Sequence, residues 1–538
     1  MAMPVILPVP QQRNDKARLE GRMRDVIVVH PADSVCVAAR DLSAGTSVEL
    51  LGGRLQLLDD VMQGHKIARK AIQSGEAILK WGQTIGFAIC RIEPGRWVHT
   101  QNMTTGALRQ EYEKSTAVPD EPTPLTDYTF QGYRRADGRA GTRNYIAVLS
   151  NVNCSASVAQ RVAARFTSER LRDFPNVTGV LAFSHGSGCG MQFGGEHHRM
   201  LNRVMGGMAR HPNIGGYILV GLGCEVGSIG HLIKDQGLVQ IDGLGTVASN
   251  STSPPLVLSM QDLGGTQKTT DEAERLVEML LPKVNAARRV TIPASEIVLG
   301  LNCGGSDGNS GITANAALGV ASDRLVACGG TTILGETTEI YGAEQLLTRR
   351  ARTPAVADKL IERIRWWEWY TGIFGCTPDN NPSPGNKVGG LTTIYEKSLG
   401  AITKAGTTAL NDVVQYAEQV RTRGFVIMDT PGMDSVSVTG IVAGGANVMA
   451  FTTGRGSCLG FKPTPVLKIA SNTPMYERMR DDMDVDAGTI LSDGRSVDDV
   501  GGEIFKQILA VASGEQPKSE QLGLGEEEFQ PWILGPVL

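Results

Sequence analysis

The chain has 538 residues, and its 52 basic and 56 acidic side chains leave a net charge of −4. This balance gives no reason to expect nucleic acid or an anionic membrane as a partner. Because no segment approaches the ~20 apolar residues of a membrane span and no signal peptide is evident, we expect a cytoplasmic protein that acts on a small molecule.

The N-terminal fifth of the chain reads as a small β-rich domain. Residues 1–22 are polar without periodicity and are expected to form a flexible lead. From 23 to 103, short β-type segments alternate with Gly and Pro, which predicts strands joined by tight turns. One helix-like piece, residues 67–72, interrupts them. Residues 104–127 are charged and proline-rich, which is typical of a linker.

The rest of the chain alternates strand-like and helix-like segments. Such alternation predicts βαβ units with mainly parallel sheets, and we divide it into two Rossmann-like α/β parts, residues 128–290 and 291–538. A long helix is expected over 355–370, and a glycine-rich loop over 380–390.

Four predicted strands end in a cysteine among glycines and small polar residues. These residues are Cys154, Cys189, Cys224 and Cys303. Ligands of open α/β sheets bind at the carboxyl ends of strands, so the four positions indicate a site. The thiols could ligate an iron–sulfur cluster or a single metal ion, act as nucleophiles, or merely fill space behind turns.

Harder ligands accompany these thiols. His185 lies four residues before Cys189, Glu225 follows Cys224, and Asp307 belongs to the loop after Cys303. A divalent ion such as iron or manganese accepts this mixture of nitrogen, oxygen and sulfur donors.

Three glycine-containing loops carry a cation suited to an anionic substrate. They contain Arg143 in GTRN, Lys387 in NPSPGNKVGG and Arg455 in TTGRGS. Backbone N–H groups and one fixed cation can converge there on a carboxylate or phosphate. Since no loop matches a nucleotide-binding motif, a nucleotide is not favoured, and each loop could also be a glycine-rich turn with an exposed cation. In the small domain, His65, Lys66 and His99 are further candidates.

Five motifs together resemble the altronate/galactarate dehydratase family, which includes the sulfolactate sulfo-lyases. They are GYRRADGRAGTRN, GLGCE, CGGSDGNSGITAN, NPSPGNKVGGLTTIYEKSLG and FTTGRGS. The resemblance implies that the small domain is a SAF (β-clip) domain, with QGHKIA as its best match. It also implies a hydro-lyase that removes the C2 proton and the C3 hydroxyl of a sugar acid such as altronate or galactarate, leaving a 2-keto-3-deoxy acid.

The resemblance suggests three sets of site residues. Base or acid roles are assigned to His65, Lys66, His99 and His185, and substrate binding to Arg143, Asn144, Ser306, Lys387 and Arg455. Metal binding is assigned among His65, His185, Cys189, Cys224, Glu225 and Asp307. Fe²⁺ or Mn²⁺ is the expected cofactor, with Mg²⁺ or Ca²⁺ as alternatives and an iron–sulfur cluster left open, and the chain is expected to form a homo-oligomer.

Two other functions fit the same pattern. A sulfo-lyase would eliminate sulfite from a sulfonated hydroxy acid, although its small and large parts are commonly separate chains. A non-catalytic sugar-acid sensor would need the anion-binding loops but not the Cys, His and Glu set.

Overall fold

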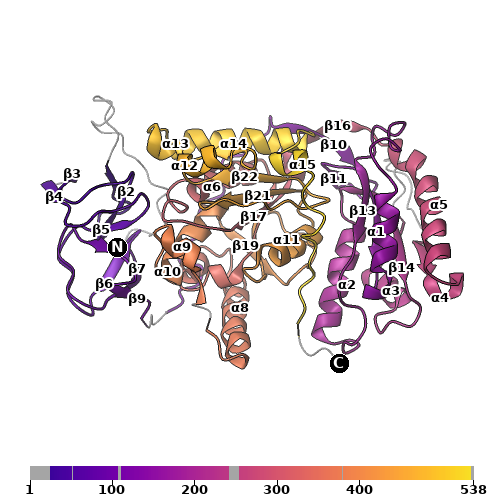
Figure 1. The fold of residues 1–538 in the computed structure, drawn as a ribbon, viewed down its shortest axis with the longest axis horizontal. Helices are drawn as coiled ribbons and strands as arrows, with labels where there is room; N and C mark the ends of the chain where they lie inside the picture. The colour runs from indigo at the N-terminus through magenta and orange to yellow at the C-terminus, as the bar shows by residue number, and fades with distance from the viewer. Residues whose placement is uncertain (1–24, 51–52, 107–110, 241–253, 378–379, 535–538) are drawn as a thin grey trace.

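The computed structural model describes residues 25–50, 53–106, 111–240, 254–377 and 380–534, and shows three bodies in a row (Figure 1). The β-rich domain lies at one end, the C-terminal α/β domain in the middle and the first α/β domain at the other end. The expected lead, residues 1–22, lies outside the described residues. Within them, no helix has both the length and the apolar character to cross a membrane.

The small domain is built from short antiparallel strands. One sheet has the order β1-β2-β5-β8, a second the order β6-β7-β9, and β3 pairs with β4. Their bounds are β1 Val26–Ile27, β2 Val35–Ala38, β3 Ser47–Leu50, β4 Gly53–Gln56, β5 Lys66–Ala68, β6 Ala77–Lys80, β7 Gln83–Ala88, β8 Trp97–Val98 and β9 Met103–Thr104.

The helix predicted over residues 67–72 is wrong. Ile67 and Ala68 lie in β5, which pairs with β2 and β8, and Ile72 forms a bridge with Ile92. Six residues are too few for a stable helix in isolation, so the neighbouring strands satisfy this backbone instead.

The described part of the linker packs on the central domain. The backbone N–H groups of Ser115, Ala117 and Leu125 donate to carbonyls of that domain at 2.9 Å. This stretch is therefore anchored along much of its length.

In the first α/β domain, all four strands are parallel, in the order β13-β12-β14-β15. The strands are β12 Tyr145–Ser150, β13 Gly179–Phe183, β14 Ile214–Gly221 and β15 Leu256–Ser259. The helices are α1 Ala156–Ala164, α2 Glu196–Ala209, α3 Ile229–Gln236, α4 Met260–Leu263 and α5 Thr266–Asn285. A small antiparallel sheet of β10 (Thr129–Arg134), β11 (Ala140–Gly141) and β16 (Arg289–Pro293) connects this domain to the next.

The central domain holds a seven-stranded parallel sheet of order β19-β20-β18-β17-β21-β22-β23. Its strands are β17 Val298–Cys303, β18 Thr331–Leu334, β19 Leu410–Val414, β20 Gly424–Met428, β21 Val448–Thr453, β22 Val466–Ala470 and β23 Val485–Asp486. Its helices are α6 Ala314–Ala327, α7 Glu344–Arg349, α8 Pro354–Ile373, α9 Pro384–Val388, α10 Ile394–Ala401, α11 Asp434–Ala443, α12 Thr473–Arg478, α13 Thr489–Ser492, α14 Val497–Ala512 and α15 Lys518–Gln521.

The α/β prediction is thus confirmed, and α8 confirms the long helix. The glycine-rich loop differs in part, because Ser383 caps the short helix α9 through a reciprocal capping box with Asn386. Two continuous apolar cores connect the bodies. One joins Ile78 and Trp81 of the small domain to Leu399 of α10, and the other joins Met205 of α2 to Ile441 of α11.

Candidate active site

The carboxyl ends of parallel strands meet at one edge of the central sheet, and ionisable side chains gather there. Cys303 is the last residue of β17, Glu336 and Glu339 follow β18, and Asp434 begins α11 after β20. Since β20, β18 and β17 are neighbours, three chain segments far apart in sequence deliver these groups to one place.

The thiol and two carboxylates form a tight buried cluster. Among the described residues, Cys303, Glu336 and Glu339 are the one set of three Cys, His, Asp or Glu ligand atoms within 4.8 Å of one another. Lys404 Nζ lies 2.7 Å from Cys303 Sγ and 2.8 Å from Glu336 Oε2. Lys397 Nζ donates to Glu339 Oε1 at 2.7 Å. The two ammonium groups therefore balance the two carboxylates.

Burial decides the protonation of this cluster. Desolvation raises the pKa of the Cys303 thiol far above its usual range, so the free thiol is neutral. Burial by itself would lower the pKa of Lys404, but the Cys303 and Glu336 side chains raise it, so this lysine stays charged. Asp434 has a pKa raised to about 8, by burial first and then by Glu336 and Glu339, and is protonated at neutral pH.

The backbone at this edge is strained. Glu336 has φ +63°, a left-handed conformation that non-glycine residues rarely adopt. Its carboxylate accepts the Cys303 N–H at 2.9 Å, and its own N–H donates to Thr430 Oγ1 at 2.6 Å. At Gly304, a Cβ would lie 2.4 Å from Asp434 Oδ2. Such strain is characteristic of functional sites and fixes the Glu336 carboxylate in place.

The donor set fits a divalent ion such as Fe²⁺ or Mn²⁺. One sulfur and two carboxylates combine soft and hard ligands, and metal binding would keep the thiol deprotonated. The Lys404 ammonium donates to Cys303 Sγ and Glu336 Oε2, which are two of these ligand atoms. A bound ion would therefore have to displace this ammonium from them or bind beside it.

The small domain packs beside this edge through its two predicted histidines. His65 Nε2 lies 3.1 Å from the Val388 carbonyl, and His99 Nε2 lies 2.9 Å from the Lys387 carbonyl. Trp97 Nε1 donates to the other nitrogen of His65. Burial lowers the pKa of His65 to about 4, so it is neutral. Both rings thus hold the end of α9.

A buried ion triad anchors the same contact. Glu396 of α10 accepts from Lys66 Nζ at 2.8 Å and from Lys80 Nζ at 2.9 Å. Lys66 also donates to the Gly390 carbonyl at 2.7 Å. The predicted Lys66 therefore lies between domains, with its ammonium engaged by protein groups.

Asp307 organises the loop after Cys303. Its Oδ1 accepts from the Ser310 N–H, Ser310 Oγ and Ser471 Oγ at 2.8 Å, and its Oδ2 accepts from Asn472 Nδ2 at 3.0 Å. With both oxygens occupied, the carboxylate joins two strand-end loops.

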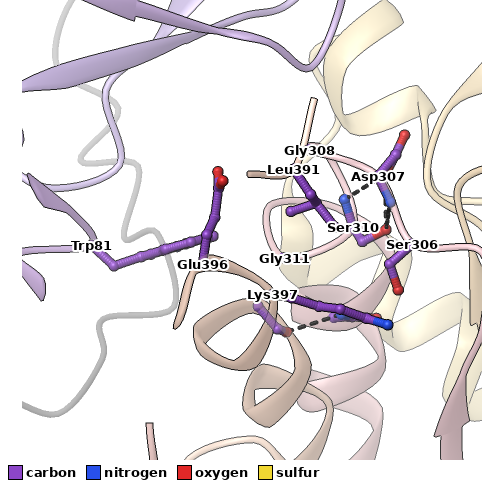
Figure 2. A pocket seen from close by; sticks show the side chains of 11 residues that line it. Trp81, Ser306, Asp307, Gly308, Ser310, Gly311, Leu391, Glu396 and Lys397 are labelled. Atoms are coloured by element: carbon purple, nitrogen blue, oxygen red, sulfur yellow. Dashed lines mark hydrogen bonds between the residues drawn. The ribbon is translucent and has the colours of Figure 1, made fainter. Parts of the chain in front are cut away.

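A small pocket opens between this loop, α10 and the small domain. Figure 2 shows Lys397 and Ser306 at one side and Trp81 at the other. The exposed Arg455 lies beside it, and the half-buried Lys387 belongs to α9, whose Asn386 Nδ2 donates to the Ser306 carbonyl at 2.9 Å. A Cβ at Gly389 would contact both Asp307 and Arg455, which places Arg455 against the pocket's loop.

Other predicted residues lie elsewhere. Arg143 is buried against Glu520, with its Nε 2.9 Å from Oε1, and donates to the Val511 and Glu515 carbonyls. Asn144 donates to the Asn176 and Val284 carbonyls. The polar side chains of Arg143 and Asn144 are therefore hydrogen-bonded to other protein groups at a domain junction. The remaining predicted residues, His185, Cys189, Cys224 and Glu225, belong to the first α/β domain.

Sequence reasoning missed Glu336, Glu339, Lys397, Lys404 and Asp434. One signal was available, because GETTE follows directly after the strand TTIL and so places two acids at a strand end. The lysines carried no signal of this kind, since α10 and the turn after it only look amphipathic.

A buried acid, thiol and lysine cluster at a parallel-sheet edge, adjoining a polar pocket, defines an α/β enzyme of small polar substrates. Profiles described as D-galactarate/Altronate dehydratase, C-terminal, as D-galactarate dehydratase/Altronate hydrolase, second domain, and as Altronate/galactarate dehydratase SAF domain match residues 294–537, 132–285 and 24–106. The chain belongs to the altronate/galactarate dehydratase family and is a hydro-lyase, which confirms the resemblance.

Three relatives illustrate the range of the family. Galactarate dehydratase (L-threo-forming) of Escherichia coli is 37% identical over 519 residues, covering 95% of this chain and 97% of the relative. Altronate dehydratase of Bacillus subtilis is 34% identical over 507 residues, covering 93% and 97%. (2R)-sulfolactate sulfo-lyase subunit beta of Chromohalobacter salexigens is 30% identical over 409 residues, covering 74% and 96%.

Proposed function

We propose that this chain dehydrates an aldonate or aldarate such as altronate or galactarate to a 2-keto-3-deoxy acid. The observation that carries the proposal is the buried Lys397–Glu339 ion pair with the half-buried Asp434 near it, at a pocket that Lys397 lines and that Arg455 and the Lys387-bearing helix α9 adjoin. Dehydration next to a carboxylate requires anion binding, a base and an acid, and this set supplies all three.

Substrate binding falls to the cations beside the pocket. Arg455 and Lys387 pair with the carboxylate next to C2, and the Ser306 hydroxyl bonds a sugar hydroxyl. A guanidinium holds a carboxylate in a fixed plane through two parallel hydrogen bonds, which orients the C2 proton toward the pocket.

Lys397 is the proposed base because it lines the pocket and is hydrogen-bonded to a proton acceptor. In the resting site Lys397 is charged because, against the lowering effect of burial, Glu339 and Cys303 raise its pKa, so it acts as a base only after its proton has passed to Glu339, 2.7 Å away. Nζ then takes the C2 proton, and the electron pair of the C2–H bond forms the enolate. The Lys404 ammonium lies close enough to the cluster to stabilise this negative charge.

Asp434 is the proposed acid. Its carboxyl is protonated at neutral pH and gives its proton to the C3 hydroxyl, so that the C3–O bond breaks and water leaves. The resulting enol then tautomerises to the 2-keto acid.

A divalent ion, Fe²⁺ or Mn²⁺, is part of this proposal. Cys303 and Glu336, with Glu339 while its carboxylate is unprotonated, would hold it, and when bound it would supply Lewis-acid stabilisation of the substrate's carboxylate and enolate.

The deciding experiment is an anaerobic assay of the full chain with added Fe²⁺ or Mn²⁺ on a panel of sugar acids, with the 2-keto-3-deoxy product detected by mass spectrometry. We expect turnover of one or more C5 or C6 sugar acids. A Lys397→Met variant that folds and dehydrates at the wild-type rate would refute the assigned base.

Sulfite elimination is the second candidate, supported by the 30% identity to a sulfo-lyase subunit. The same base would act, and sulfite would leave in place of water. Sulfite release from sulfolactate without keto acid from any sugar acid would select this activity. The sensor hypothesis is not favoured, because the three relatives named above are enzymes and this chain carries the buried acid, thiol and lysine cluster.

A further inference from the structure

Three thiols of the first α/β domain have no role in the proposed lyase site. Cys154, Cys189 and Cys224 follow β12, β13 and β14, which are adjacent in the order β13-β12-β14, and all three are exposed. Free cysteine is among the most buried residue types, so three exposed thiols at one sheet edge call for a chemical explanation.

Hydrogen bonds hold the three loops against one another. The Asn153 N–H donates to the Ser187 carbonyl at 2.9 Å, and the Gly227 N–H donates to the Gly188 carbonyl at 3.3 Å. Neighbouring strands lie about 4.8 Å apart, so three adjacent strand ends span roughly 10 Å. The three cysteines therefore lie on one compact, connected surface.

Glycines beside two of the cysteines fix the backbone. Gly188, before Cys189, has φ +104°, and a Cβ there would lie 2.7 Å from the Asn151 carbonyl oxygen. Gly223, before Cys224, has φ +123°, and a Cβ would lie 2.6 Å from Gln261 Oε1. No other residue suits either position, so the loops have one defined shape.

The buried acid and histidine of this domain support the loops. Glu225 accepts the Gly223 N–H at 2.7 Å and Asn151 Nδ2 at 3.2 Å. His185 Nδ1 accepts the Ser187 N–H at 3.1 Å. Glu225 and His185, which the sequence predicted as metal ligands, thus stabilise the cysteine loops through these hydrogen bonds.

We propose that Cys154, Cys189 and Cys224 ligate a [4Fe–4S] cluster. A sulfur ligand lies about 2.3 Å from a single ion such as zinc, so thiolates that share one ion are at most about 4.6 Å apart. Among the described residues these thiols do not form a set within 4.8 Å, whereas a cluster joins thiolates at wider separations. Each thiol loses its proton on ligation, and three thiolates leave one iron open to a further ligand.

The test is anaerobic reconstitution of the full chain with equal amounts of ferric and ferrous iron and with sulfide, followed by desalting and measurement of iron, acid-labile sulfide and visible absorption. We expect about four iron and four sulfide per chain. The variants C154S, C189S and C224S should each lose most of the sulfide and the absorption. The variants C90S and C376S remove exposed thiols in the other two domains and should load as the wild type does.

Sulfide-free iron binding, or undiminished sulfide in the folded triple variant C154S/C189S/C224S, would overturn the proposal. Circular dichroism of each variant establishes that the fold is intact. The inference does not rest on the proposed lyase function, because its readout is the cluster itself. A Lys397→Met variant should load the cluster normally whether or not it dehydrates sugar acids.

Discussion

Glu396→Gln tests how the small domain is attached to the catalytic domain. The glutamate lies between the ammonium groups of Lys66 and Lys80, and all three side chains are buried to 99% or more. Removing one partner of a buried ion pair costs about 3–5 kcal/mol, because uncompensated charge stays in the interior. At about 1.4 kcal/mol per factor of ten, the undocked population should rise roughly 10² to 10³-fold.

The measurement is hydrogen exchange of the backbone amides of β5 and β6 in the full chain, resolved by mass spectrometry. Hydrogen exchange of the β5 and β6 amides that occurs when the small domain undocks should accelerate by the same factor. The exchange rates of the β14 amides should not change. The matched control is the triple variant K66M/K80M/E396M. Replacing a whole buried ion cluster by apolar side chains is often neutral or stabilising, so the triple variant should be better protected than Glu396→Gln alone.

The same triad predicts acid sensitivity. Burial by itself would raise the pKa of Glu396, but Lys66 and Lys80 lower it from 4.5 to about 2. A lowered carboxyl pKa stabilises the folded state above about pH 4.5, and this contribution is lost as the pH falls toward 2. The reasoning would be refuted if the exchange protection of the wild-type β5 and β6 amides stayed constant as the pH fell from 4.5 toward 2. It would also be refuted if K66M/K80M/E396M were less protected than Glu396→Gln.

Three further predictions concern the lyase site. Asp434→Asn should lower the dehydration rate roughly 10² to 10⁴-fold but keep the exchange of the C2 proton with D₂O, which NMR follows. Lys397→Met should lose both dehydration and exchange. Loss of exchange in Asp434→Asn would contradict separate acid and base roles. Arg455→Ala should raise KM by about 10 to 100-fold, with Arg455→Lys recovering part of the loss, and an unchanged KM would remove this residue from carboxylate binding. Glu336→Gln should weaken Mn²⁺ binding at least tenfold in equilibrium dialysis, while equal affinity would place the ion elsewhere.

Much of the architecture is readable from local pattern. Alternating strand and helix periods predict parallel sheets, and parallel sheets bring strand ends together, so the Cys303 loop is recognisable as part of a site. Lys387 and Arg455 also stand out in the sequence, because each lies in a glycine-rich segment, although the structure places Lys387 in α9. The misread segment 67–72 shows the limit of local pattern, since β2 and β8 decide its conformation from 29 or more residues away.

The sequence by itself determined the family, the fold class and the strand-end cysteines, because these depend on ordered motifs and on residue periodicity. Tertiary structure alone decided which thiol joins which acids. Cys303 meets Glu336, Glu339 and Lys404 because β18 lies beside β17 and the turn after α10 brings Lys404 to the Cys303 thiol, whereas Cys154, Cys189 and Cys224 follow strands of a separate sheet. Burial, which no local pattern reports, then sets the charge of Asp434 and places Glu396 between two lysines.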